Sequence, residues 1–347
     1  MIITYFRSSS YNAHNMCEQQ YFFEYVLGWR GPSNKKADKG TIVHKVLEIL
    51  AVIKQGLQDN KKIVDDDTIG KIDTHKYNLD HIIEQVYQYY TKQFSHHEWE
   101  KKDYKDCYSW VYKAINYHNG MFDPRNRTIV CPEQRFDITI EQPWSYYKYE
   151  TNEGVLEGNL AIKGTIDLIT KIDDDTYELI DWKTGRRLDW ATGAEKTQEK
   201  LETDPQLSIY HYALKKIYPN IKNIIVTIYF INDGGPFSVC FNESDLSKTE
   251  QMLRDKFEYI KKTKKPKLNK SWICNKLCHF GKTTFENSHV LPILEYRDNQ
   301  LTPINNHMTK CEQVKHDIEL KGMKEVVDQY TMPGYTVGKY KAPGSVE

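Results

Sequence analysis

Gly164-Thr165-Ile166-Asp167-Leu168-Ile169 opens the stretch that decides the fold of this chain of 347 residues. It continues through the turn Asp173-Asp174-Asp175 into Tyr177-Glu178-Leu179-Ile180-Asp181-Trp182-Lys183-Thr184-Gly185. Both flanking runs are rich in apolar and β-branched residues, and the acidic cluster between them is typical of a tight turn. We therefore predict an antiparallel hairpin that is symmetric about Asp174.

In a hairpin with this symmetry, Asp167 and Asp181 lie directly opposite each other. Opposed side chains have Cβ atoms about 4.5–5.5 Å apart, and like charges at that distance are destabilising. Lys183 follows Asp181 by two residues and therefore points to the same face. A bound divalent cation would explain the costly pair, since hard oxygen ligands suit magnesium or manganese. The alternative for so short a motif is an ordinary exposed hairpin with a Lys–Asp pair.

Composition narrows the class of protein. The chain carries 48 basic and 48 acidic residues, so it is not a globally basic nucleic-acid coat, although local basic patches remain open. Its seven cysteines are odd in number and scattered, which indicates reduced thiols. The start Met1–Arg7 lacks the apolar core of a signal peptide, and no apolar run reaches transmembrane length. We expect a cytoplasmic protein that is neither secreted nor bound to a membrane.

The first 127 residues are predicted to be mainly helical. An aromatic stripe indicates one helix from about residue 10 to Gly28, and the polar segment 31–40 is expected to be a mobile loop. Thr41 to Gln55 is a strong amphipathic helix that places His44 on one surface with Glu48, four residues later. A charged insertion at 57–77 and further helices at 80–95 and 106–119 complete this region.

From Thr128 the pattern changes to strands, with alternating apolar residues as far as residue 140. Asp204 and Pro205 form a helix start, Asp as the N-cap and Pro in the first turn. We predict further strands at 145–150, 223–231 and 236–241, an irregular segment at 286–311 and a last helix at 312–330. The predicted division is an N-terminal helical region at 1–127, a core at 128–284 and a C-terminal extension at 285–347.

Two groups of basic residues are candidates for phosphate contacts. Arg186 and Arg187 directly follow the hairpin and therefore lie close to its acidic pair. Residues 261–267 hold five lysines, among them Lys264 and Lys265. Such runs are usually solvated helix ends, but they also suit a nucleic-acid backbone.

Four short motifs follow one another along the chain. They are Gly40-Thr41-Ile42-Val43-His44, Gly164-Thr165-Ile166-Asp167, Asp181-Trp182-Lys183-Thr184-Gly185 and Gln206-Leu207-Ser208-Ile209-Tyr210. Together they resemble the RecB-type branch of the PD-(D/E)XK nucleases, which includes RecB and AddB nuclease domains and CRISPR-associated, phage and mitochondrial exonucleases. The resemblance covers about residues 8–280. It implies an α/β fold with a restriction-endonuclease-like core, in which helices flank a mixed central sheet and a helical region precedes it.

The resemblance also implies roles for single residues. Asp167 and Asp181 would bind magnesium or manganese, His44 would be a further metal ligand, and the carbonyl of Trp182 could contribute. Lys183 would position the attacking water and offset charge at the phosphate. Three more residues follow from the resemblance: Gln206 and Tyr210 would brace the site and touch the DNA, and Glu133 matches an accessory acidic position.

The function implied by the resemblance is a magnesium-dependent DNA exonuclease that hydrolyses single strands or DNA ends in replication, recombination or repair. A structure-specific endonuclease on the same core is the first alternative. A non-catalytic nucleic-acid-binding subunit is the second, but a decayed site would be expected to lose at least one of Asp167, Asp181 and Lys183, and all three are present.

Many relatives of this branch hold an iron–sulfur cluster, with one cysteine near the N-terminus and three near the end of the domain. Three cysteines lie where such ligands would fall, namely Cys17, Cys274 and Cys278. The next candidate, Cys311, is 33 residues beyond Cys278. We therefore expect a degenerate cluster site with free thiols and no iron–sulfur cluster. The alternatives are a four-cysteine cluster, with Cys311 as the first candidate for the missing ligand, and a zinc site with His14 or His279 as the fourth ligand.

Overall fold

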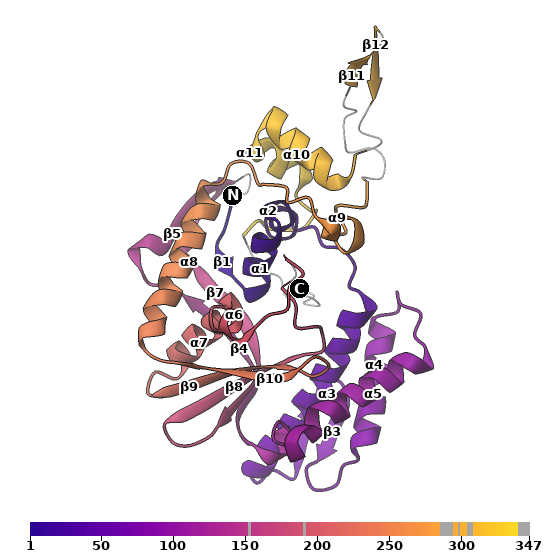
Figure 1. Ribbon diagram of the computed structural model, residues 1–347, viewed down its shortest axis with the longest axis vertical. Coiled ribbons are helices and arrows are strands. Elements are labelled where there is room, and N and C mark those ends of the chain that lie inside the picture. Colours follow the sequence, from indigo (N-terminus) through magenta and orange to yellow (C-terminus); the bar gives the residue numbers. More distant parts are fainter. Residues whose placement is uncertain (152–153, 190–191, 285–293, 298, 304–307, 339–347) are drawn as a thin grey trace. The chain divides into compact units, whose positions relative to one another are not determined.

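The computed structural model describes residues 1–151, 154–189, 192–284, 294–297, 299–303 and 308–338. The chain forms two compact units (Figure 1). The first consists of Met1–Pro32, Ile138–Lys163 and Glu250–Glu347, and the second of Ser33–Asp137 and Gly164–Thr249. Because the chain crosses between the units four times, neither unit is one continuous segment.

A mixed β-sheet organises the second unit. Its strands β7 and β8 are antiparallel, β8 and β9 are parallel, and β9 and β10 are antiparallel, while β4 pairs with β7. The prediction of an α/β fold with a mixed central sheet is therefore confirmed. The strand bounds are Thr128–Thr139 for β4, Ala161–Lys171 for β7, Thr176–Lys183 for β8, Asn223–Phe230 for β9 and Gly235–Phe241 for β10.

The register of the β7–β8 hairpin is the predicted one. Leu168 pairs with Ile180 and Ile169 pairs with Leu179, so the hairpin is symmetric about Asp174. In the turn, the backbone N–H of Asp175 donates to Oδ1 of Asp173 at 2.9 Å. This register places Asp167 and Asp181 at corresponding positions just beyond the paired residues.

Helix α7 (Pro205–Ile217) connects β8 to its parallel neighbour β9, and a short helix, α6 (Gln198–Glu202), precedes it. The Asp204 side chain accepts from the backbone N–H of Gln206 at 2.9 Å, which confirms the predicted N-cap. The same carboxylate forms an ion pair with Lys196. The start of α7 is thus fixed beside the end of β8, where the candidate catalytic residues lie.

Helix α3 (Lys35–Gln58) begins six residues before the predicted helix. The Asn34 side chain accepts from the backbone N–H of Ala37 at 2.9 Å and caps the helix, so the mobile loop predicted for 31–40 is wrong from Lys35 onward. Figure 1 shows α4 (Leu79–Gln93) and α5 (Lys101–Asn116) packed beside α3.

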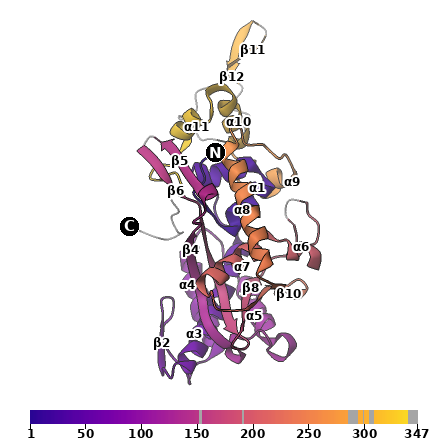
Figure 2. The same cartoon turned by 90° about the vertical axis from the view of Figure 1, so that its left-hand side faces the viewer.

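The predicted charged insertion at 57–77 contains a hairpin, β2 (Ile63–Asp66) and β3 (Gly70–Asp73), visible next to α3 in Figure 2. Lys45 of α3 is buried and lies 2.9 Å from Asp66 and 2.7 Å from Asp67. These contacts were not predicted, because the pattern of the sequence does not reveal which carboxylates a helical lysine meets.

The N-terminal helix of the first unit differs from its prediction. It is broken at Cys17, whose backbone is extended, into α1 (Ser8–Met16) and α2 (Glu18–Tyr21), and α2 runs on into a π-helical turn at Phe22–Val26. Strand β1 (Tyr5–Phe6) pairs in parallel with Ala161 and Ile162, and β5 (Tyr146–Thr151) pairs with β6 (Gly154–Asn159).

The C-terminal part of the first unit holds α8 (Ser244–Lys262), which starts in the second unit, and α9 (Trp272–Lys276). Instead of one last helix there are two, α10 (Lys310–Lys321) and α11 (Met323–Tyr330), separated by Gly322 at φ 88°. The segment predicted as irregular contains β11 (Leu294–Arg297) and β12 (Gln300–Pro303), while its residues 286–293, 298 and 304–307 lie outside the described residues. No helix among the described residues combines the length and apolarity needed to cross a membrane.

Gly164 is required by close packing at the start of the hairpin. A Cβ atom there would lie 2.6 Å from the Phe136 ring, which is buried and packs edge-on against Tyr210. We expect Gly164→Ala to lower the free energy of unfolding by about 1–3 kcal/mol, as overpacking does. The matched control is Gly185→Ala, because a Cβ there meets no atom within 4 Å. Urea unfolding of both variants tests this, and equal midpoints would contradict it.

Candidate active site

Three elements of the second unit bring the candidate catalytic residues together. Asp167 comes from β7, Asp181 and Lys183 from β8, and His44 from the first half of α3. Nδ1 of His44 lies 3.3 Å from Oδ2 of Asp167, and Nζ of Lys183 lies 2.6 Å from Oδ2 of Asp181. Each carboxylate therefore has its own basic partner, which offsets the repulsion expected between the two aspartates.

Asp181 is the most enclosed of these residues, at 1% exposure. Its Oδ1 accepts from Nε2 of Gln206 at 3.0 Å and from the Tyr210 hydroxyl at 3.4 Å. Gln206 also donates to the Tyr210 oxygen at 3.0 Å. The first two turns of α7 thus hold one oxygen of Asp181 in place through Gln206 and Tyr210. The other oxygen, Oδ2, contacts Lys183 but accepts no well-aligned hydrogen bond from a described residue.

The two aspartates differ in their protonation behaviour. Burial acts to raise the pKa of Asp167, but His44 and Lys183 outweigh it and hold the pKa below its ordinary value. Burial raises the pKa of Asp181, and Lys183 only partly opposes this rise. For His44, burial acts to lower the pKa, but the Asp167 carboxylate outweighs it and raises the pKa. Asp181 is therefore the carboxylate whose ionised form an additional cation would stabilise most.

Glu133 enters the same cavity through a local distortion of β4. Its backbone has φ 46°, a left-handed conformation that is unusual for a residue with a side chain and typical of a bulge. Burial and the nearby carboxylates Asp167 and Glu48 raise the pKa of Glu133 to about 8. The accessory acidic position expected from the resemblance is therefore next to Asp167.

A cavity of about 430 Å³ opens at these residues. It is lined by His44, Lys45, Glu48, Glu133, Asp167, Trp182 and Lys183, together with Ala37, Gly40, Thr41, Tyr90, Thr184 and Gly185. A Cβ atom on Gly40 would lie 2.7 Å from Oγ1 of Thr184. The glycine of the first motif thus allows α3 to approach the end of β8.

The residues of this site can supply ligands for a divalent cation. The carboxylates of Asp167 and Asp181 are the hard oxygen donors that magnesium and manganese accept in proteins, whereas the imidazole of His44 suits transition metals better. Oδ2 of Asp181 is a buried oxygen without a good hydrogen bond. Among the described residues, however, the ligand atoms of His44, Asp167 and Asp181 do not all lie within 4.8 Å of one another. A cation that takes all three must therefore replace the ion pairs now present.

A second group of metal-type ligands lies near the start of α3. Ligand atoms of Asp38, His96 and His97 all lie within 4.8 Å of one another. Our sequence analysis missed this group, although two consecutive histidines were a signal that could have drawn attention to it.

The four basic residues predicted to contact phosphates differ in whether their charged groups are exposed or already bound to other residues. Arg186 is exposed. The Arg187 guanidinium donates to the Lys196 carbonyl at 2.7 Å, forms an ion pair with Glu195 and lies over the Phe237 ring. Arg187 is thus engaged in its own loop. Lys264 and Lys265 are exposed and belong to the first unit.

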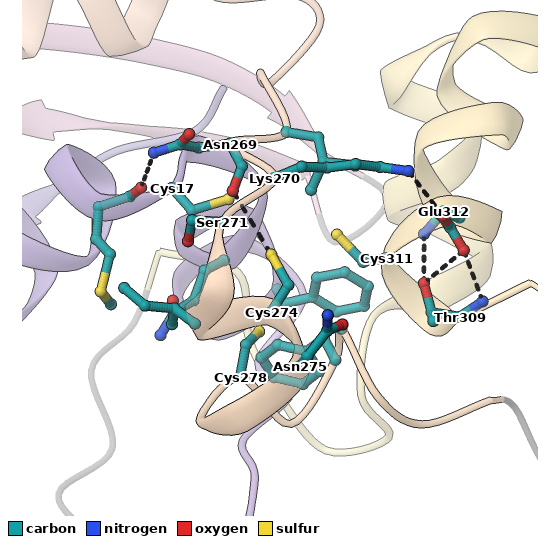
Figure 3. Close-up of a pocket in the computed structure, with 17 residues that line it drawn as sticks. Cys17, Asn269, Lys270, Ser271, Cys274, Asn275, Cys278, Thr309, Cys311 and Glu312 are labelled. Atoms are coloured by element: carbon teal, nitrogen blue, oxygen red, sulfur yellow. Dashed lines mark hydrogen bonds and ion pairs between the residues drawn. The ribbon is translucent and has the colours of Figure 1, made fainter. Parts of the chain in front are cut away.

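The cysteines of the first unit are placed differently from our expectation. One pocket is lined by all four candidates, Cys17, Cys274, Cys278 and Cys311 (Figure 3). Cys311 lies at this pocket although it is 33 residues beyond Cys278, because α10 packs against α2. Neither His14 nor His279 lines this pocket, so the zinc alternative loses its proposed fourth ligands.

This chain is similar to a solved structure and to a family model. A solved structure from Eubacterium rectale, which its description names provisionally as an exonuclease, shares 11% sequence identity at a TM-score of 0.44, over 82% of this chain and 90% of that chain. No curated protein matches the sequence. A family model described as the PD-(D/E)XK nuclease superfamily matches residues 8–282, which include all four motifs. This chain belongs to the PD-(D/E)XK nuclease superfamily.

Proposed function

We propose that this protein is a magnesium-dependent DNA exonuclease of the RecB-like branch that acts on single strands or DNA ends. The observation that carries the proposal is the arrangement of Asp167, Asp181 and Lys183 on two paired strands, with His44 facing Asp167. Family membership supports nuclease chemistry. The order of the four motifs supports the branch and, with it, the exonuclease mode.

Asp167, Asp181, His44 and the carbonyl of Trp182 would hold one or two magnesium or manganese ions. A cation bound there lowers the pKa of a water and neutralises charge on the phosphoryl oxygens. Water adds to phosphorus, one P–O ester bond breaks, and the products carry a phosphate and a hydroxyl. Lys183 positions the water and offsets the negative charge that develops on the phosphate.

The remaining residues act on these groups. Gln206 and Tyr210 hold Asp181 through its Oδ1 and touch the DNA strand where it passes the start of α7. Glu133 adds a carboxyl group that mostly carries its proton at neutral pH, because burial and nearby carboxylates raise its pKa to about 8. For the DNA backbone we propose Arg186, Lys264 and Lys265 as phosphate contacts, and Arg187 as a residue that shapes its own loop.

The biological role that we propose is DNA processing in replication, recombination or repair, in the cytoplasm of a cell or during phage growth. The RecB-like resemblance supports this role, and membership of the nuclease superfamily is consistent with it.

The experiment that tests the proposal is digestion of linear and closed circular DNA, single- and double-stranded, labelled at either end, with and without magnesium. We expect degradation of linear strands from an end and no cleavage of covalently closed circles. Cleavage of the circles would instead establish an endonuclease. Binding without cleavage under any metal would establish a non-catalytic subunit.

Our first prediction for this site concerns the two residues of β8. Asp181→Asn should lower the rate by at least about 10³-fold, and Lys183→Ala by about 10²–10³-fold, because each removes charge that acts on the phosphate or its cation. DNA binding should persist in both variants. Matched controls on the same hairpin are Asp174→Asn and Lys171→Ala, since both side chains are exposed and pair with each other. Rates near wild type in either catalytic variant would refute the mechanism.

A second prediction concerns His44. It contacts Asp167 from a helix and not from the hairpin, so His44→Ala should lower activity less than Asp181→Asn, by about tenfold or more, and change the ratio of magnesium- to manganese-supported rates. His81→Ala, on an exposed face of α4, is the control. An unchanged ratio and rate would show that His44 only supports Asp167 structurally.

A further inference from the structure

Two histidines and one aspartate that the proposed mechanism does not use meet in the second unit. Asp38 lies in the first turn of α3, and His96 and His97 lie in the loop between α4 and α5. One ligand atom of each residue lies within 4.8 Å of those of the other two. Among the described residues, no other three histidine, cysteine, aspartate or glutamate side chains come together so closely.

Oδ2 of Asp38 is the atom on which this group converges. It lies 2.7 Å from Nε2 of His97 and 3.8 Å from Nε2 of His96. The Ser33 hydroxyl donates to the same oxygen at 2.7 Å, and its Oγ lies 3.3 Å from Nε2 of His96. Two nitrogen or oxygen ligands of one zinc-like ion, at bond lengths of about 2.0–2.2 Å, lie about 3–3.5 Å apart. The observed separations lie on either side of this value, so an ion would require only small side-chain movements.

The loop that carries the histidines is held in shape by its own contacts. The backbone N–H of His97 and the indole N–H of Trp99 both donate to the Phe94 carbonyl, each at 3.1 Å. The Trp99 ring also packs edge-on against the His97 ring, with centroids 5.7 Å apart. His97 is therefore directed toward Asp38 by a loop whose shape does not require an ion.

The simpler explanation is that the histidines only neutralise a buried carboxylate. Asp38 is 3% exposed, and the hydrogen bond with His97 is sufficient for that purpose. At 3.8 Å from Oδ2, His96 is too far away to add a second good hydrogen bond. The two imidazole rings lie 4.0 Å apart, where two positive charges would repel each other, whereas two neutral imidazoles can bind the same cation. A shared ion therefore explains the position of His96, which neutralisation does not.

The group is accessible from solvent on one side. The side chain of His96 is 45% exposed, while Asp38 remains enclosed. An ion can therefore enter past His96 and reach a carboxylate that is already fixed by Ser33 and His97.

The ligand types select the class of ion. Magnesium and calcium prefer oxygen ligands, whereas imidazole nitrogens suit zinc, nickel, copper and iron. Three protein ligands leave at least one coordination position of such an ion for water or for the Ser33 hydroxyl.

We propose that Asp38, His96 and His97 form a binding site for one divalent transition-metal ion. The ion would join the start of α3 to the loop between α4 and α5. His44 follows Asp38 by six residues, which is about 9 Å along a helix axis, so this site is distinct from the proposed catalytic one. Because Gly40 is the point where α3 approaches the end of β8, the ion would hold α3 beside that contact. The proposal does not depend on the nuclease activity proposed above.

The test is calorimetric titration of Ni²⁺ into untagged, chelator-treated protein in excess magnesium, with Asp181→Asn as the background to disable the proposed catalytic metal site. His97→Gln should bind one Ni²⁺ per chain fewer than this background. Its amide N–H can still donate to Asp38, so the loss would not reflect an unpaired carboxylate. His96→Ala should weaken the same binding by about tenfold or more. Ni²⁺ bound elsewhere, at the cysteines for example, is common to all variants and cancels in the comparison.

Thermal unfolding provides a second measurement. Ni²⁺ should raise the unfolding midpoint of the background protein and of the control His81→Ala, which changes an exposed residue of α4, but not that of His97→Gln. If His97→Gln does not fold, the exposed His96 decides through His96→Ala. Equal Ni²⁺ affinity and stoichiometry in His96→Ala and His81→Ala would overturn the proposal and show that Asp38 is only neutralised by its neighbours.

Discussion

The second unit depends on one constraint, the repulsion between two carboxylates that face each other across the β7–β8 hairpin. The register that pairs Leu168 with Ile180 leaves Asp167 and Asp181 at corresponding positions, where they repel unless positive charge is supplied. His44 and Lys183 supply it in the structure. The close approach of α3, which brings His44 to this hairpin, requires a glycine at position 40.

The same ion pairs link metal binding to catalysis in the proposed mechanism. Lys183 neutralises Asp181 across 2.6 Å, and a cation held by the two aspartates would supply that charge and leave Lys183 available to the phosphate. Gln206 and Tyr210 hold the Oδ1 oxygen, so Oδ2 is the oxygen of Asp181 that could bind a cation. The lysine of this pair is 34% exposed and its aspartate 2%, so Lys183 can reach a phosphate that approaches from solvent while Asp181 stays enclosed.

Much of the fold and of the candidate site could be predicted from residues that are close together in sequence. The hairpin register followed from the turn and strand pattern, and the start of α7 followed from Asp204 and Pro205, because each depends on residues that are neighbours in sequence. The predictions were wrong where the conformation depends on a single side chain or on a segment distant in sequence. Asn34 starts α3 early, Cys17 interrupts a helix, and Cys311 reaches the pocket only because α10 folds back. The conformations of such positions depend on tertiary contacts.

The cysteine pocket is formed by segments of the first unit that are far apart in sequence, because the chain passes repeatedly between the two units. Segments of the first unit are separated along the chain by the whole second unit, so the loops that join Cys17 to Cys274 and Cys311 are long. Closing loops of this length costs conformational entropy in folding, and a cross-link between their ends removes that cost from the unfolded state. In this structure the packing of α10 against α2, which brings Cys17 and Cys311 to one pocket, closes these loops while both cysteines remain free thiols. The stability of the first unit therefore depends on non-covalent contacts between helices that are far apart in sequence.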